Sequence, residues 1–268
     1  MNVYFKELKA YRKSIIIWSI SMILLIFMAF EKYDALALGG EETADFLEII
    51  NQMPKFLQAI MGLSNFDITT PIGYSAVMYI YLVLMGAIHA GMIGAGIITK
   101  EEKEKTVEFL MVKPITRFKI VKNKMLVALT NVVIFNIITF VSLLLVLIWK
   151  NVFTYNIIGD LGLLMLGILF VQILFLTIGF SFALMKKKYK QAASLTMVIL
   201  LSSYFLSMII DVVPDLKFLS VLTPFKYYDA KGLLDNGLNI WYLLLTMFLI
   251  VVLLTIGIKK YQQRDLNI

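Results

Sequence analysis

Few residues of this 268-residue chain could carry out chemistry on a substrate. The chain has no cysteine, which excludes a thiol nucleophile, a disulfide and a cysteine metal site, and its only histidine is His89. Gly91 and Gly96 have the glycine spacing of a phosphate-binding loop, but Ile97 occupies the position of the required lysine. Residues 179–183 resemble a nucleophile elbow only loosely and have no histidine base nearby. These patterns predict no catalytic residue, no metal site and therefore no enzyme.

The composition indicates a membrane protein. Hydrophobic residues make up 60% of the chain, only 16% is charged, and the mean hydropathy is +0.85. A soluble domain is usually about a quarter charged, and so many apolar residues do not fit in one water-soluble core. The composition therefore excludes a soluble enzyme, a disordered chain and a nucleic-acid-binding module.

Six apolar stretches are long enough to cross a membrane as helices, which takes about 20 residues each. They are residues 14–30, 72–98, 125–149, 161–185, 191–213 and 240–258. A helix satisfies its own backbone hydrogen bonds in lipid. We therefore expect an all-α polytopic membrane protein whose residues 1–268 form a single transmembrane domain.

The charges predict the orientation of the chain. With the N-terminus in the cytoplasm, the inner segments hold 19 of the 25 Lys and Arg residues but only 6 of the 18 Asp and Glu residues. These segments are residues 1–13, 99–124, 186–190 and 259–268. Since cytoplasmic loops collect Lys and Arg, we expect a multi-pass protein of the plasma membrane with both termini in the cytoplasm. The Lys-, Ile- and Asn-rich composition indicates a bacterial source.

Three segments outside the spans are too apolar for solvated loops. Residues 1–13 mix apolar and basic side chains, which favours an interfacial helix over a flexible basic tail. Residues 214–239 suit an external re-entrant or interfacial hairpin. Residues 31–71 contain an apolar stripe at helical spacing, which Pro54 should kink or divide. The stripe either packs on the external ends of the spans or forms an extracellular gate.

The second span contains small residues four apart, including Gly86, Ala90 and Gly94. Such residues let helices approach closely in lipid, and packing within the chain is favoured over a dimer seam. His89 lies among them. An ionisable residue within a span is a functional candidate, although an imidazole bonded to a neighbouring helix is the favoured interpretation.

Residues 100–118, after the second span, form the most informative segment. It begins with alternating charges and continues as an amphipathic helix with Val107, Leu110 and Met111 on one face, and Pro114 ends that helix. A charged helix beside the membrane could dock into a groove on a soluble partner. The alternative is a solvated charged loop.

The same segment resembles the coupling region of ABC exporter permeases of the type-2 class. That family has an acidic–basic run, then Thr-x-Glu-x-Leu, then Pro-[Ile/Val]-[Ser/Thr]-Arg, which match residues 102–105, 106–110 and 114–117. Lys105 replaces the glycine that many members have before the threonine. Residues 223–230 (Thr-Pro-Phe-Lys-Tyr-Tyr-Asp-Ala) are similar to the external hairpin before the last span of these permeases.

The resemblance implies a half-transporter. Two permease chains, identical or similar, would pair around a gap lined mainly by the first, second and fifth spans. Each would bind a separate ATP-binding subunit, which would hold ATP and Mg²⁺, so this chain itself would bind no cofactor. The residues that would couple to the ATPase are Glu101, Glu102, Glu104, Thr106, Val107, Glu108, Phe109, Leu110, Met111 and Arg117.

The candidate transport path is apolar and aromatic, which favours an amphipathic or hydrophobic cargo such as an antimicrobial or toxin peptide, or a drug. Its candidate path or gate residues are Phe46, Ile49, Ile50, Met53, Tyr79, Tyr81, His89, Tyr204, Phe205, Pro224 and Phe225. The alternative function is that of an ATP-independent membrane carrier or channel. Such a protein usually needs carboxylates at the membrane midplane or broken spans, and the sequence indicates neither.

Overall fold

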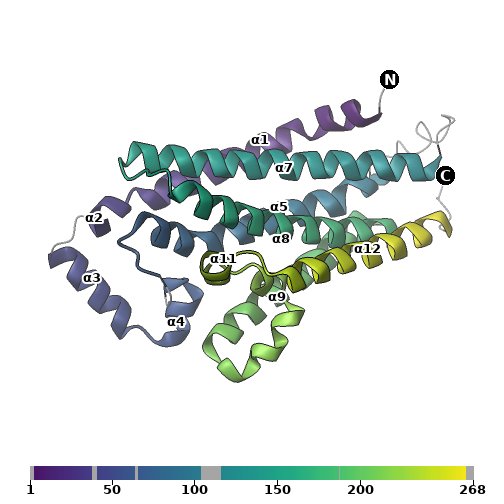
Figure 1. The fold of residues 1–268 in the computed structure, drawn as a ribbon. Coiled ribbons are helices and arrows are strands. Elements are labelled where there is room, and N and C mark those ends of the chain that lie inside the picture. Colours follow the sequence, from purple (N-terminus) through teal and green to yellow (C-terminus); the bar gives the residue numbers. More distant parts are fainter. Residues whose placement is uncertain (1–2, 38–40, 64–65, 104–115, 187, 264–268) are drawn as a thin grey trace.

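The computed structural model describes residues 3–37, 41–63, 66–103, 116–186 and 188–263, and these residues form helices and turns without strands (Figure 1). Six helices are long and apolar enough to cross a membrane. They are α1 (Val3–Phe30), α5 (Pro71–Lys103), α7 (Arg117–Trp149), α8 (Ile157–Met185), α9 (Tyr189–Val212) and α12 (Ile240–Gln263). The predicted all-α class and all six spans are confirmed.

Shorter helices connect the long ones at two places. Between α1 and α5 lie α2 (Tyr33–Ala37), α3 (Glu41–Gln52) and α4 (Lys55–Ile60). Between α9 and α12 lie η2 (Pro214–Leu222), α10 (Pro224–Tyr227) and α11 (Ala230–Asn236). We call these three short helices, residues 214–236, the hairpin, and their re-entrant position in the membrane stays a prediction. Pro54 separates α3 from α4, as predicted from its missing backbone N–H.

The first helix differs from its prediction. Residues 3–13 do not form a separate interfacial helix, because α1 runs without a break from Val3 to Phe30. No proline or glycine lies between the basic turns and the apolar turns, so nothing ends the helix there. The helix α7 likewise begins at Arg117, eight residues before the apolar run, where the Thr116 hydroxyl accepts the Lys119 N–H at 3.4 Å as an N-cap.

The centre of the bundle is the contact between α5 and α8, which lie against each other over much of their length (Figure 1). Glycines permit this approach. A Cβ on Gly94 would lie 2.3 Å from the Leu176 carbonyl oxygen, and a Cβ on Gly179 would lie 2.4 Å from the Gly91 carbonyl oxygen. The small residues of the second span therefore serve packing within the chain, as expected.

The helices α1 and α12 lie at the edges of the bundle. The helix α1 packs mainly on α7, and α12 packs mainly on α8. Each leaves large apolar side chains uncovered, such as Met28 and Trp241, which are 73% and 75% exposed. Apolar surface of this extent is typical of membrane or protein contact. The two chain termini lie at the same end of the bundle (Figure 1).

Candidate functional site

The predicted ATPase-coupling segment lies mostly outside the described residues. Seven of its candidates fall there: Glu104, Thr106, Val107, Glu108, Phe109, Leu110 and Met111. Glu101 and Glu102 belong to the last turn of α5, and Arg117 is the first residue of α7. Figure 1 places the end of α5 and the start of α7 at the end of the bundle where both termini lie.

Buried contacts hold the two helices that flank this segment. The Lys124 side chain is 1% exposed, and its Nζ donates a hydrogen bond from α7 to the Ile97 carbonyl oxygen of α5. The Tyr4 hydroxyl lies 2.9 Å from Oγ1 of Thr130, which joins α1 to α7. The end of α5 is therefore tied to α7, and α7 is tied to α1.

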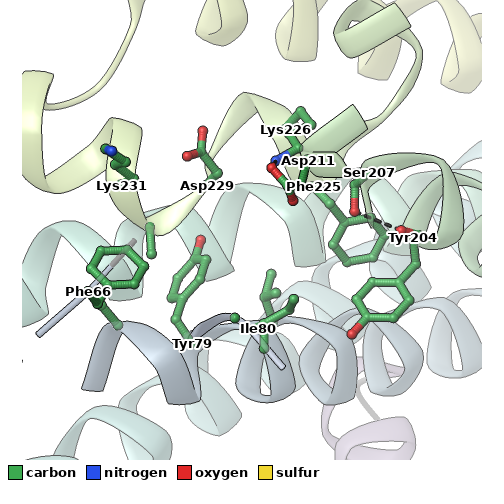
Figure 2. A pocket seen from close by; sticks show the side chains of 14 residues that line it. Phe66, Tyr79, Ile80, Tyr204, Ser207, Asp211, Phe225, Lys226, Asp229 and Lys231 are labelled. Carbon is green, nitrogen blue, oxygen red and sulfur yellow. Dashed lines mark hydrogen bonds and ion pairs between the residues drawn. The ribbon is translucent and has the colours of Figure 1, made fainter. Parts of the chain in front are cut away.

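A pocket lies at the hairpin, where α5 and α9 meet it (Figure 2). Its cavity volume is about 80 Å³. Three candidate path residues, Tyr79, Tyr204 and Phe225, are brought together in its wall. The other lining residues are Gly62, Phe66, Ala76, Ile80, Val83, Ser207, Asp211, Lys226, Asp229, Ala230 and Lys231. The pocket has an aromatic and aliphatic floor and a charged rim on the hairpin side (Figure 2).

Three buried hydroxyl groups attach the hairpin to three long helices. The Tyr79 hydroxyl of α5 donates to the Tyr228 carbonyl oxygen at 2.6 Å. The Thr223 hydroxyl donates to the Ser203 carbonyl oxygen of α9 at 2.8 Å. The Tyr228 hydroxyl lies 2.8 Å from Oγ1 of Thr246 on α12. Because buried polar groups are costly to leave unpaired, these bonds hold the hairpin in one position relative to α5, α9 and α12.

Aromatic rings fill the space beneath the hairpin. The Phe225 ring lies 5.4 Å from the Phe175 ring of α8 and 5.3 Å from the Tyr204 ring of α9, and such pairs add to the stabilisation from area burial. The hairpin also reaches some way along α8, because a Cβ on Gly167 would lie 2.5 Å from Cδ1 of Leu233. Gly167 lies ten residues into α8, about 15 Å from its start.

The charged rim was not predicted from the sequence. Lys226 of the hairpin forms an ion pair with Asp211, in the last turn of α9. The Asp229 carboxylate caps α11 by accepting the Gly232 N–H at 3.1 Å. The only signal for the ion pair was a carboxylate at the edge of a span, and its partner lies 15 residues later, beyond the reach of any local pattern.

A tight turn leads into α5 next to the pocket. The Thr69 hydroxyl and backbone N–H donate to the Asp67 carboxylate at 2.6 and 3.0 Å, which lowers the pKa of Asp67 below its usual value. The Thr70 hydroxyl accepts the Gly73 N–H at 3.1 Å. These bonds end the connection from α4 and start α5 at a defined position.

The candidates of the α3–α4 stripe do not line the pocket. Ile50 is buried, Met53 is half-buried, and Ile49 is 53% exposed. Phe46 belongs to α3, but its side chain is outside the description. The side chains described do not form one buried face, because Ile49 points away from the protein while Ile50 packs in the core.

Three other path candidates lie near the pocket without lining it. Tyr81 is half-buried on α5, Phe205 is 57% exposed on α9, and Pro224 is buried at the start of α10. The Phe205 ring lies edge-on to the Tyr204 ring with 6.2 Å between centroids.

His89 lies deeper in the bundle, away from the pocket. Its ring stacks on Phe135 of α7 with 4.3 Å between ring centroids, and it lies 5.4 Å from the Trp18 ring of α1. Neither ring nitrogen has a hydrogen-bond partner among the residues that the structure describes. The expected direct hydrogen bond to a neighbouring helix is therefore not formed within the described part of the chain, where aromatic rings pack on two sides of the imidazole.

The sequence matches a known protein family. A family model described as "ABC-2 family transporter protein" matches residues 1–266, nearly the whole chain. No curated protein matches the sequence.

Proposed function

The chain belongs to the ABC-2 transporter family, and from this premise we propose that it is the membrane subunit of an ATP-driven exporter. It is a multi-pass membrane protein with the helices of a transport subunit. In our proposal a separate ATP-binding subunit docks on residues 100–118 in the cytoplasm, and a second permease chain completes the transporter. The family match over residues 1–266 is the observation that carries the proposal.

The path of coupling runs along α5. This helix starts at the pocket, ends in the proposed docking segment, and has 33 residues, so it is about 50 Å long. Close packing on α8 and the buried bond from Lys124 support its action as a rigid rod. Closure of the ATPase would therefore displace the end of α5 that carries Glu101 and Glu102, and the displacement would reach Tyr79 at the other end.

The hairpin would be the outer gate of the path. The pocket beneath it, at about 80 Å³, has room for only a few water molecules, since each needs about 10–15 Å³ by the same kind of measure. An amphipathic peptide or a drug is far larger, so this conformation is closed to such a cargo. Release of the cargo would require the hairpin to separate from Tyr79.

Transport by inside-out membrane vesicles tests the function. The chain would be co-expressed with a candidate ABC ATP-binding subunit, and uptake of a fluorescent amphipathic peptide would be measured with ATP and with a non-hydrolysable analogue. We expect uptake of the peptide with ATP and no uptake with the non-hydrolysable analogue. Uptake at equal rates without ATP would favour the ATP-independent carrier or channel and contradict the proposal.

A further inference from the structure

Three buried polar side chains lie at mid-length of neighbouring helices, away from the pocket beneath the hairpin. They are His89 on α5, Asn136 on α7 and Gln172 on α8, with exposed fractions of 0%, 8% and 0%. Each is at least 13 residues from either end of its helix, a distance of about 20 Å along the helix axis. Bulk water at the ends of the bundle is therefore remote from all three.

Contacts place these side chains on adjoining turns of the three helices. The His89 ring stacks on Phe135, and the next residue of α7, Asn136, donates from Nδ2 to Oε1 of Gln172 at 3.3 Å. Nε2 of Gln172 lies against Gly86, one turn before His89 on α5, where a Cβ would be only 2.7 Å away. The absence of a side chain at Gly86 leaves room for the amide beside α5.

Three nitrogen atoms of the cluster have no hydrogen-bond partner among the described residues. They are Nδ1 and Nε2 of His89 and Nε2 of Gln172. Buried polar atoms nearly always have a partner, because removing them from water without one is costly. A neutral imidazole offers one donor and one acceptor, and the amide nitrogen donates. A ligand that both donates and accepts, and that fits beside glycine, would satisfy these atoms.

We propose that His89, Asn136 and Gln172 form a water-binding site inside the bundle, walled by the rings of Trp18 and Phe135. The cluster has no carboxylate, so water fits it better than a cation. Water bridges the α5 imidazole to the α8 amide. A direct bond would favour one relative position of the two helices, whereas a bound water can bridge several. The site does not depend on coupling to ATP.

The single histidine makes the test specific to one residue. Protein labelled with ¹⁵N-histidine in lipid vesicles gives ring-nitrogen signals from His89 alone. Water-edited solid-state NMR measures how fast magnetisation passes from water to those nitrogens. We expect transfer to at least one ring nitrogen much faster than to the methyl groups of the surrounding core. Transfer as slow as that to the core methyl groups would overturn the proposal.

Two variants of α8 separate the site from general packing. Gln172→Leu removes the amide and is expected to slow water transfer to His89 several-fold. Thr177→Val removes an equally buried hydroxyl, which donates within α8 to the Ile173 carbonyl oxygen at 2.8 Å, and is expected to leave the transfer unchanged. Asn136→Leu replaces Gln172→Leu if the latter fails to elute as a folded protein. Equal effects of the site variant and the control would contradict the assigned site.

Discussion

Replacing Tyr79 with phenylalanine is expected to loosen the hairpin and leave the bundle intact. The substitution keeps the buried ring and removes only the hydroxyl that donates to the Tyr228 carbonyl oxygen at 2.6 Å. A hydrogen bond contributes a net ~0.5–1.5 kcal/mol, and leaving a buried partner unsatisfied costs ~1–3 kcal/mol. We therefore expect hairpin docking to weaken by about 1–2 kcal/mol.

Amide hydrogen exchange followed by mass spectrometry in lipid nanodiscs measures this change. The amides of residues 224–236 exchange through local opening of the hairpin, so their rates report its docking free energy. A loss of about 1–2 kcal/mol corresponds to exchange faster by a factor of about 5–30. The amides in the middle of α8 are expected to keep their rates.

Tyr74 provides a matched control on the same helix. Its hydroxyl donates to the Ala29 carbonyl oxygen at 2.6 Å, which joins α5 to α1 and not to the hairpin. Tyr74→Phe is expected to speed exchange near the end of α1 and to leave residues 224–236 unchanged. Unchanged hairpin exchange in Tyr79→Phe, or equally faster exchange in both variants, would refute the role assigned to the Tyr79 hydroxyl.

Three further predictions concern the ion pair, the helix contact and the turn before α5. Asp211→Asn breaks the ion pair with Lys226, and because the pair is partly exposed we expect the free energy of unfolding to fall by at most about 1 kcal/mol, and by less in high salt. Thermal unfolding measures this loss, and Lys226→Met completes a double-mutant cycle. Gly179→Ala places a Cβ 2.4 Å from an α5 carbonyl oxygen and should lower the free energy of unfolding by about 3 kcal/mol or more. Gly159→Ala on the same helix meets open space and should be neutral or slightly stabilising in the same unfolding assay. The pKa of Asp67 is lower in the folded protein than in the unfolded chain, so its stabilising contribution is complete at neutral pH and is lost as the pH falls from about 4 through the folded pKa. Asp67→Asn should therefore reduce the acid sensitivity of exchange in residues 66–73, and an unchanged profile would contradict this.

The spans were predictable because crossing lipid demands long apolar helices, and each predicted stretch lies largely within a helix of the structure. The helix ends were less predictable. The helix α7 extends eight residues before its apolar run, since helical hydrogen bonding continues through Lys and Arg once Thr116 caps the end. Hydropathy detects the apolar stretch that can cross the membrane and not the hydrogen-bonded length of the helix.

The pocket was predictable only in part. Tyr79, Tyr204 and Phe225 were selected as aromatic residues of a path, and the structure brings them together. The pairing of Asp211 with Lys226 depends on how the hairpin folds back on α9, which no local pattern encodes. The surroundings of His89 also depend on helices distant in sequence, so its aromatic neighbours were not foreseen.

Complex formation with the ATP-binding subunit is the most direct test of the proposed docking on residues 100–118. The chain would be co-expressed with that subunit and purified in nanodiscs as the parent, as a variant with Glu104, Glu108 and Leu110 changed to Ala, and as a matched control. The control changes two acidic residues and one apolar residue that are exposed on the hairpin: Asp215, Asp235 and Phe218.

We expect the parent and the hairpin control to elute with the ATPase and to hydrolyse ATP at similar rates. The variant of the coupling segment, with unchanged helical content, is expected to elute alone. If the coupling variant still eluted with the ATPase, or if the parent chain bound no ATPase in any lipid composition, the proposed docking on residues 100–118 would be contradicted.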